Sequence, residues 1–301
     1  MRIAVAATPD VALPTLDSLL RSSHQLVFVI TQPDRPAGRG QALHESAVSS
    51  WCSKNEITCH KPMSTLETLD LLMGIDLLIT IGYGVLLPSE LLHAPRNGCI
   101  NLHFSLLPRW RGAAPVQRAI EAGDSVSGVT VFQLDEGMDT GPIYRVARFA
   151  LDDDITSDEL MVELGELGAE PVLQTISDIE AGIRPSVQSA EGATRAIKLS
   201  KQEGEIAWTM SADALVNKVR AFTSNPGAWT TFRGTTIKIE DVAPTEEVFT
   251  PGEIAIIEKA LIVGTGTKAV KIGFLTPSGK PRTDAKSWLN GARITVGERF
   301  G

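Results

Sequence analysis

Residues 98–115 read Gly-Cys-Ile-Asn-Leu-His-Phe-Ser-Leu-Leu-Pro-Arg-Trp-Arg-Gly-Ala-Ala-Pro, an apolar run that leads directly into polar side chains. Its first five residues are typical of a buried strand, with Asn101 and His103 at the carboxyl end. Helical patterns separate this strand from three similar runs. The alternation predicts an α/β fold, a Rossmann-like open parallel sheet with helices on both faces. The three other predicted strands of this kind are 2–7, 26–31 and 76–81, and further strands are predicted at 128–134 and 143–151.

Three polar side chains stand where such a sheet binds ligands, beyond the carboxyl ends of its strands. Asn101 and His103 end one strand, and Asp139 follows His103 by 36 positions in the loop Gly-Met-Asp-Thr-Gly at 137–141. Asparagine can donate to an oxyanion, histidine can move a proton near neutral pH, and aspartate can hold an imidazolium. These groups suit acyl transfer to an amine, which needs no serine or cysteine nucleophile if the amine attacks directly.

Several other classes of protein do not fit the chain. The first strand-to-helix turn, residues 6–10, reads Ala-Ala-Thr-Pro-Asp, without the glycines of a dinucleotide-binding turn, and the sequence has no P-loop. Its three cysteines, Cys52, Cys59 and Cys99, form no C-x-x-C pair. We therefore expect no disulfide framework and no metal site, and a reducing cytoplasm as the location. The sequence has no run of 18 apolar residues, so no membrane-spanning helix is predicted.

The second half of the chain changes character. One long helix is predicted over 156–181, a polar linker over 184–202, and a helix near 211–222. Short strand patterns with turn residues between them then favour a small β-barrel. We predict a first domain at 1–183, the linker at 184–202 and a second domain at 203–301. The predicted barrel strands are 229–233, 235–241, 253–258, 261–264, 269–275 and 293–296.

The charge of the chain is unevenly distributed. The net charge is −8, but residues 203–301 carry twelve basic and eleven acidic residues, which leaves −9 on the preceding part. Residues 268–299 include seven basic and only two acidic residues. This local excess indicates either a phosphate-facing patch or a solvated surface of mixed charge. The basic residues are Lys268, Lys271, Lys280, Arg282, Lys286, Arg293 and Arg299.

The run at 98–115, taken with Asn101, His103 and Asp139, resembles the folate-dependent formyltransferases, and most closely the branch of that family that formylates methionyl-tRNA. The resemblance extends to the loop at 32–40 and to residues 198–201 and 226–229. It implies 10-formyltetrahydrofolate as cosubstrate, initiator methionyl-tRNA as acceptor and an OB-like barrel for the second domain. We also expect a monomer that requires no metal.

The resemblance also implies roles for individual residues. Asn101 and His103 would stabilise the oxyanion of the tetrahedral intermediate, while Asp139 would keep His103 protonated or correctly oriented. A second group would form the folate site, since apolar residues beside glycines can wall a flat pteridine ring. That group comprises Tyr83, Gly84, Leu86, Ser105, Leu106, Leu107 and Pro108.

Four basic residues would contact the tRNA. Arg35 and Arg39 belong to the 32–40 loop, which enters the acceptor end of the tRNA in the family, and Lys198 and Lys201 belong to the linker. The sequence departs from the family just after this loop, because Gln41 and Ala42 stand where many members have lysines. The phosphate attraction of the loop is correspondingly weaker.

Two alternatives remain open from the sequence. A sugar-nucleotide formyltransferase shares the Asn-His-Asp set, but should lack the 32–40 loop and the Arg-Trp-Arg-Gly-Ala-Ala-Pro form at 109–115. A non-catalytic RNA-binding protein would not require Asn101, His103 and Asp139 together. Glycinamide ribonucleotide transformylase is excluded, because that enzyme normally ends near residue 200.

Overall fold

The computed structural model describes residues 1–37 and 42–301, and its chain divides into two compact units. The first unit comprises residues 1–115, 126–150 and 161–196. The second comprises residues 116–125, 151–160 and 197–301. Within the described part of the chain, no helix combines the length and apolar character needed to cross a bilayer.

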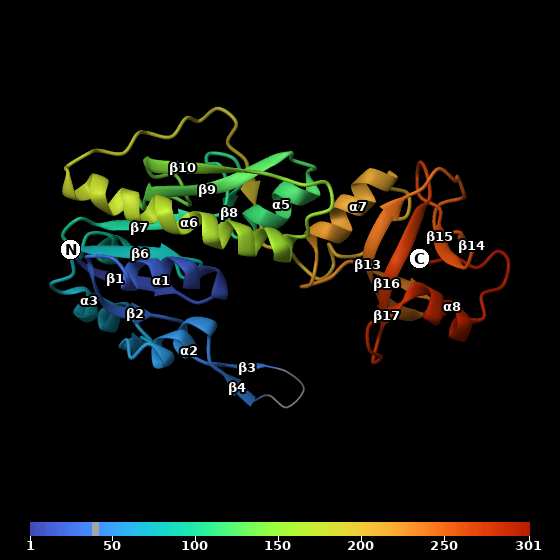
Figure 1. Cartoon of the computed structure of the whole chain (residues 1–301), viewed down its shortest axis with the longest axis horizontal. Coiled ribbons are helices and arrows are strands. Elements are labelled where there is room, and N and C mark those ends of the chain that lie inside the picture. The colour runs from blue at the N-terminus through green and yellow to red at the C-terminus, as the bar shows by residue number, and fades with distance from the viewer. Residues whose placement is uncertain (38–41) are drawn as a thin grey trace. The chain divides into compact units, whose positions relative to one another are not determined.

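The first unit is built on a seven-stranded sheet in the order β10-β9-β7-β6-β1-β2-β5 (Figure 1). Strands β5, β2, β1, β6 and β7 are parallel. At one edge, β9 pairs antiparallel with β7, and β10 pairs antiparallel with β9. The Rossmann-like prediction is confirmed, and so are the strands predicted at 128–134 and 143–151; their antiparallel pairing was not predicted. The strands are β1 (Arg2–Ala7), β2 (Gln25–Ile30), β5 (Cys59–His60), β6 (Leu77–Ile81), β7 (Cys99–His103), β9 (Val126–Gln133) and β10 (Ile143–Ala150).

Short helices connect the parallel strands, and serine side chains begin two of them. The Ser46 and Ser64 hydroxyls accept from the third backbone N–H beyond, which stabilises each helix start. The helical segments are η1 (Asp10–Ala12), α1 (Leu13–Leu20), α2 (Ala47–Lys54), α3 (Thr65–Leu72), α4 (Ser89–Leu92), α5 (Pro115–Glu121) and α6 (Ser157–Glu180). Two small pairs of strands complete the description: β3 (Arg35–Ala37) with β4 (Ala42–His44), and β8 (Arg111–Gly112) with β11 (Arg195–Ala196).

One face of strand β7 packs against helix α6, and the other carries the polar residues Asn101 and His103. Side chains alternate along a strand, so Asn101 and His103 share one face and Leu102 points to the other. Leu102 is 1% exposed, and it packs where α6 carries Gly168. A Cβ at Gly168 would lie 2.5 Å from a Leu102 methyl, so only glycine lets the helix approach this closely. Figure 1 shows α6 running over the sheet.

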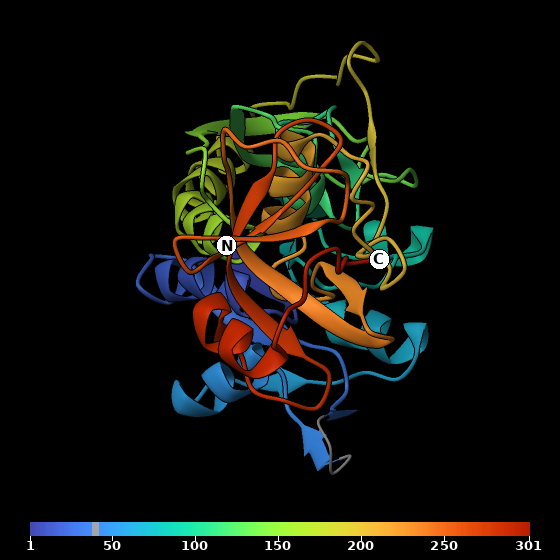
Figure 2. The ribbon, with the colours of Figure 1, turned by 90° about the vertical axis from the view of Figure 1, so that its right-hand side faces the viewer.

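The second unit holds an antiparallel sheet in the order β12-β13-β16-β15-β14, with β17 paired to β16 (Figure 2). This curled half-barrel confirms the predicted small β domain. Trp208 stacks on Phe300 in its core at a centroid distance of 5.6 Å. The elements are α7 (Ala212–Ala221), β12 (Trp229–Phe232), β13 (Thr235–Pro244), β14 (Ile254–Ile257), β15 (Ala260–Val263), β16 (Val270–Pro277), β17 (Thr283–Asp284) and α8 (Ala285–Ala292).

The prediction of a strand at 293–296 is wrong, and helix α8, which ends just before it, was not predicted. Asp284 caps α8 by accepting from the Ser287 N–H, and Arg293 ends it in the left-handed region at φ 48°. Ala285 and Leu289, four positions apart, bury the apolar side of the helix. The apolar residues at 294 and 296 suggested a strand, but Val296 is fully exposed.

Leu102→Ala should lower the free energy of unfolding by about 3 kcal/mol, because it opens a cavity between β7 and α6. Urea unfolding measures the change, and Leu66→Ala is the matched control, since Leu66 is 67% exposed. Equal losses in the two variants would contradict this account of the β7–α6 contact.

Candidate active site

A cavity of about 410 Å³ opens within the first unit, beyond the carboxyl ends of β6 and β7. It brings the predicted trio Asn101, His103 and Asp139 together. Residues from the β6–α4 loop, the β8 segment and the β9–β10 loop complete its lining. Three predicted folate residues, Tyr83, Gly84 and Leu86, lie on the same wall. The other four, Ser105, Leu106, Leu107 and Pro108, are outside the lining.

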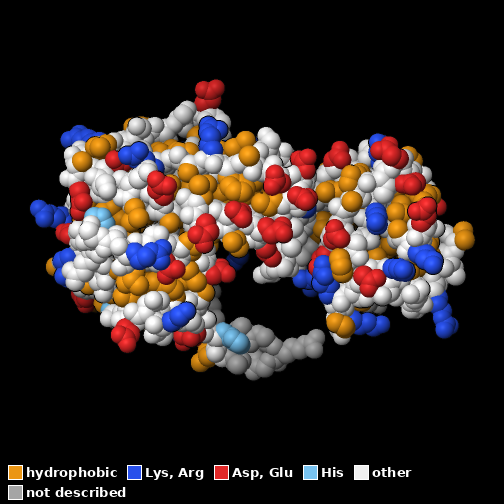
Figure 3. All heavy atoms as spheres, in the orientation of Figure 1, with side chains coloured by type: hydrophobic (Ala, Val, Ile, Leu, Met, Phe, Trp, Pro, Cys, Tyr) orange, Lys and Arg blue, Asp and Glu red, His pale blue; other side chains and the backbone are white. Residues whose placement is uncertain are grey.

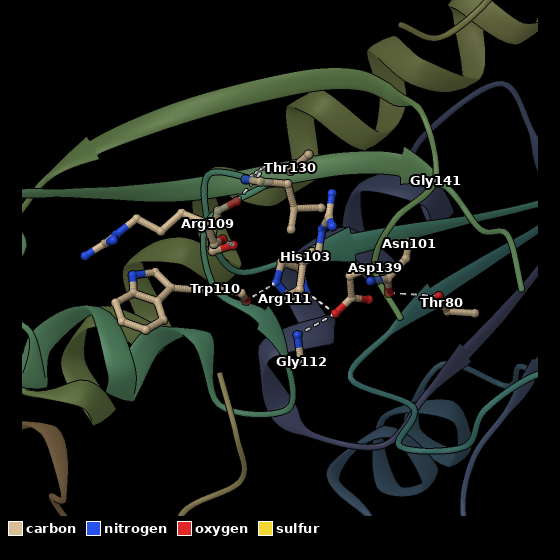
Figure 4. Close-up of polar contacts among 12 residues, drawn as sticks. Thr80, Asn101, His103, Arg109, Trp110, Arg111, Gly112, Thr130, Asp139 and Gly141 are labelled. Carbon is tan, nitrogen blue, oxygen red and sulfur yellow. Dashed lines mark hydrogen bonds and ion pairs between the residues drawn. The ribbon is translucent and has the colours of Figure 1, made fainter. Parts of the chain in front are cut away.

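The carboxamide of Asn101 is held by a neighbouring strand. Thr80 on β6 pairs with Asn101 on β7, and its hydroxyl donates to Asn101 Oδ1 at 2.8 Å (Figure 4). Since that bond uses the carbonyl end of the amide, the Nδ2 end is left to donate into the cavity. Sequence reasoning did not single out Thr80. Its position at the end of a parallel strand was the available signal.

His103 is 6% exposed, and a hydrogen bond at one ring nitrogen, Nε2, holds it in place. Its Nε2 lies 2.9 Å from the Trp110 carbonyl oxygen, and its Nδ1 lies 3.7 Å from Asp139 Oδ2 (Figure 4). A carbonyl can only accept, so Nε2 carries a proton. A proton taken up at Nδ1 would point at the Asp139 carboxylate. Trp110 has φ 65°, in the left-handed region, which is uncommon for a bulky residue.

Asp139 is 16% exposed and is anchored by a backbone donor. The Gly112 N–H donates to Asp139 Oδ2 at 2.7 Å, the same oxygen that faces His103. Asp139 itself has φ 54°, inside a loop that Asp135 braces by accepting from Gly137 N and Thr140 Oγ1. The carboxylate therefore links the β8 segment to the histidine.

The turn at 105–108 stabilises the chain beside the cavity. Ser105 Oγ donates to the Arg109 carbonyl at 2.7 Å, while Thr130 Oγ1 donates to the Ser105 carbonyl and accepts from Leu107 N. Ser105 is 1% exposed, which leaves it little surface for a ligand. Its assignment to the folate site stays a prediction.

The cavity combines polar groups at one end with apolar walls. Leu87, Leu92 and Leu134 line it beside Tyr83, and burial raises the pKa of the Tyr83 phenol, so that it stays neutral at physiological pH. Among the described residues, no serine or cysteine side chain lines the cavity. The arrangement offers hydrogen-bond donors and a proton-transfer group next to a surface suited to a flat ring.

The predicted tRNA residues fall on different segments. Lys198 and Lys201 are exposed in the second unit, on a segment that Arg118 fixes by donating to the Ile197 carbonyl at 3.1 Å. Arg118 also pairs with Glu203 at 2.7 Å. Arg35 begins strand β3, and Arg39 lies outside the described residues.

The basic set at 268–299 is partly neutralised. Lys268 pairs with Glu246 and Arg282 with Glu240, each at 2.7 Å. Figure 3 shows Lys and Arg side chains interspersed with Asp and Glu on the visible face of this unit. The pattern favours a surface of mixed charge there over a single strong phosphate patch.

Comparison with known families identifies the chain. The family model for formyl transferase matches residues 1–176, and the model for the formyl transferase C-terminal domain matches residues 198–293. The chain belongs to the formyltransferase family. It is 41% identical to the methionyl-tRNA formyltransferase of Thermobifida fusca, over 100% of this chain and 99% of the relative.

Solved structures share the fold at much lower identity. HypX from Aquifex aeolicus, in complex with tetrahydrofolic acid, gives a TM-score of 0.69 at 19% identity, covering 98% of this chain and 48% of HypX. WlaRD, a sugar 3N-formyl transferase, gives 0.70 at 18% identity, covering 93% and 99%. At these identities the likeness extends to the fold alone.

Glu203→Gln should destabilise the chain in a pH-dependent way. The hydrogen bond from Arg118 lowers the pKa of Glu203 to about 2, so its stabilising effect is complete above its ordinary pKa of about 4.5. The effect is lost as pH falls from about 4.5 through about 2. Because Glu203 is 42% exposed, solvent screening limits the effect to about 1 kcal/mol or less.

Urea unfolding of Glu203→Gln and wild type from about pH 3 to 7 measures the difference, which should shrink on the acid side. The exposed Glu191→Gln serves as control. A constant difference across this range would show that the Arg118 pair is not its source.

Proposed function

We propose that this chain transfers the formyl group of 10-formyltetrahydrofolate to the α-amine of initiator methionyl-tRNA, acting as a monomer in the cytoplasm. The observation that carries the proposal is the grouping of Asn101, His103 and Asp139 around one cavity. The full-length similarity to methionyl-tRNA formyltransferases supports the choice of acceptor.

The reaction needs few groups from the protein. The amine nitrogen attacks the formyl carbon, a C–N bond forms, and the carbonyl oxygen becomes an oxyanion. Asn101 Nδ2 and a proton on His103 Nδ1 donate to that oxyanion, since His103 Nε2 already donates to the Trp110 carbonyl. Such donors are effective because they are already oriented. The bond to folate N10 then breaks. The amine loses one proton and N10 gains one, and Asp139 with a water provides the route between them.

The folate would lie with its flat ring system against the loop that carries Tyr83, Gly84 and Leu86. Two features support this placement. These residues line the same cavity as the catalytic trio, and Leu86 is 71% exposed, an apolar side chain available for a ligand to cover. Tetrahydrofolic acid is the ligand of the structurally similar HypX complex.

Binding of tRNA must overcome the acidic character of residues 1–202, whose net charge is −9. Lys198 and Lys201 would contribute phosphate contacts from their anchored segment, and Arg35 and Arg39 would position the acceptor end. Such contacts release counterions, so the affinity should depend on salt.

Direct transfer assays test the proposal. Purified protein with 10-formyltetrahydrofolate is offered methionyl-tRNA, an amino-sugar nucleotide, or uncharged tRNA. Formylation of methionyl-tRNA alone is expected. Formylation of the amino-sugar nucleotide alone would replace the proposal with the sugar-nucleotide reaction, which the fold likeness to WlaRD makes the second candidate. No transfer to either acceptor would contradict both.

Asn101→Ala and His103→Ala should each lower kcat by about 10²–10³, the usual cost of one oxyanion donor. The exposed His93→Ala is the matched control, and thermal melting verifies folding. Near-normal turnover in either folded variant would remove that residue from the reaction.

Thr80→Val should lower kcat by about tenfold while leaving the KM for folate nearly unchanged, because Asn101 loses the donor that orients its amide. Thr80→Ser keeps the hydroxyl and should retain activity. If serine and valine reduce kcat equally, packing rather than the hydrogen bond is what matters at this position.

Replacing both Lys198 and Lys201 with alanine should raise the KM for methionyl-tRNA and flatten its dependence on salt. Each lost phosphate contact removes about 0.7–0.9 from the slope of log affinity against log salt. The KM for folate should not change. Measurements from about 50 to about 300 mM salt cover the range in which counterion release is visible. A salt-independent KM for methionyl-tRNA in the wild type would contradict this model of binding.

A further inference from the structure

Residues 186–196 lie between the two family matches, which end at 176 and begin at 198. In this stretch, a linker by sequence, only three side chains are withdrawn from solvent. Gln188 and Thr194 are half-buried and Ala196 is 1% exposed, whereas Val187 is 91% exposed. The stretch therefore has an inward side, and it belongs to the first unit.

Gln188 joins two segments of the active site. Its Oε1 accepts from the Arg111 guanidinium at 2.7 and 3.2 Å. Its Nε2 donates to the carbonyl oxygens of Asp139 at 3.0 Å and of Gly141 at 2.6 Å. A primary amide has two acceptor sites and two donor hydrogens, so this one side chain can satisfy all four bonds.

The far end of the stretch fixes the other side of the site. Thr194 Oγ1 accepts from Trp110 N at 2.9 Å, and the Thr194 carbonyl accepts from Arg111 N at 2.9 Å. The Ala196 carbonyl accepts from Ala113 N at 2.9 Å. Trp110 is the residue whose carbonyl contacts His103, so this end restrains the histidine while Gln188 restrains the aspartate.

The near end is anchored as well. Ser186 and Ile143 on β10 exchange two backbone hydrogen bonds, at 2.7 and 2.8 Å. Gln188 thus lies two residues from a fixed point on the sheet, so the hydrogen bonds of its amide can restrain the Asp139 loop. The backbone of Asp139 lies in the left-handed region, which residues other than glycine seldom adopt, so the loop must hold it there.

We propose that three inward-facing residues of this stretch, Gln188, Thr194 and Ala196, support the active site, and that Gln188 is a positioning residue that sets the Asp139 carboxylate against His103. The inference rests on the proposed function for its kinetic consequences, but its structural consequence is independent of any substrate. Loss of the two Nε2 donors releases the Asp139 loop, and the His103 Nδ1–Asp139 contact loosens with it.

Two variants separate the contacts of Gln188. Gln188→Met removes every hydrogen bond at similar volume. Gln188→Glu keeps an acceptor for Arg111 but loses both donors to the carbonyls of 139 and 141. Both variants should lower kcat by about tenfold, the equivalent of about 1.4 kcal/mol, with little change in the KM for folate. Val187→Ala is the matched control, one residue away and exposed.

A second measurement, NMR of the His103 ring, does not depend on enzymatic activity. In protein labelled with ¹⁵N-histidine, the His103 ring resonances are assigned as those lost in His103→Ala. They should move in Gln188→Met and Gln188→Glu, and stay in place in Val187→Ala. If the wild type transfers no formyl group, the proposed function fails, yet these shifts still test the positioning role.

Wild-type kcat together with unmoved resonances in both variants would overturn the inference. A loss of kcat confined to Gln188→Met would also overturn it, because the contact with Arg111, and not the bonds to the loop carbonyls, would then explain the effect. If Gln188→Met does not fold, Gln188→Glu decides alone.

Discussion

The hydrogen bond from the Gly112 N–H to the Asp139 carboxylate is the contact on which the rest of the site depends. It requires the β8 segment to pass close to β11, and Gly112 permits this. At φ 123°, a Cβ there would lie 2.7 Å from the Ala196 carbonyl oxygen. A side chain would push β8 from β11 and move both the donor to Asp139 and the Trp110 carbonyl that holds His103. The positions of His103 and Asp139 therefore depend on one glycine.

The environment of the trio explains how neutral donors could work on a developing charge. His103 is 6% exposed, and Asn101 and Asp139 lie beside apolar walls, so water competes weakly for their hydrogen bonds. Three of the groups that hold the trio are themselves fixed: Thr80 by the sheet, Gly112 by β11, and the 139 loop by Asp135 and Gln188. Such preorganisation is what makes an oxyanion site effective, because little rearrangement remains to be done during the reaction.

The sequence predicted the parts that local pattern controls. Apolar runs located β1, β2, β6 and β7, and the polar ends of those strands located Asn101 and His103. What it missed is non-local or belongs to the backbone. The Gly112 N–H and the Trp110 carbonyl have no side-chain signature, and Gln188 reaches the site from 49 positions beyond Asp139. Helix α8 was missed because two apolar positions after it, 294 and 296, imitate a strand, while its cap at Asp284 is a single polar residue.

The central claim is that His103 and Asp139 act as one unit, and a double-mutant cycle on kcat for formyl transfer tests it most directly. His103→Ala, Asp139→Ala and the double variant are compared with wild type under saturating substrates. If the two side chains work through their 3.7 Å contact, the double variant should be about as slow as the slower single variant. If the two single losses multiply in the double variant, the residues act independently and the account is contradicted.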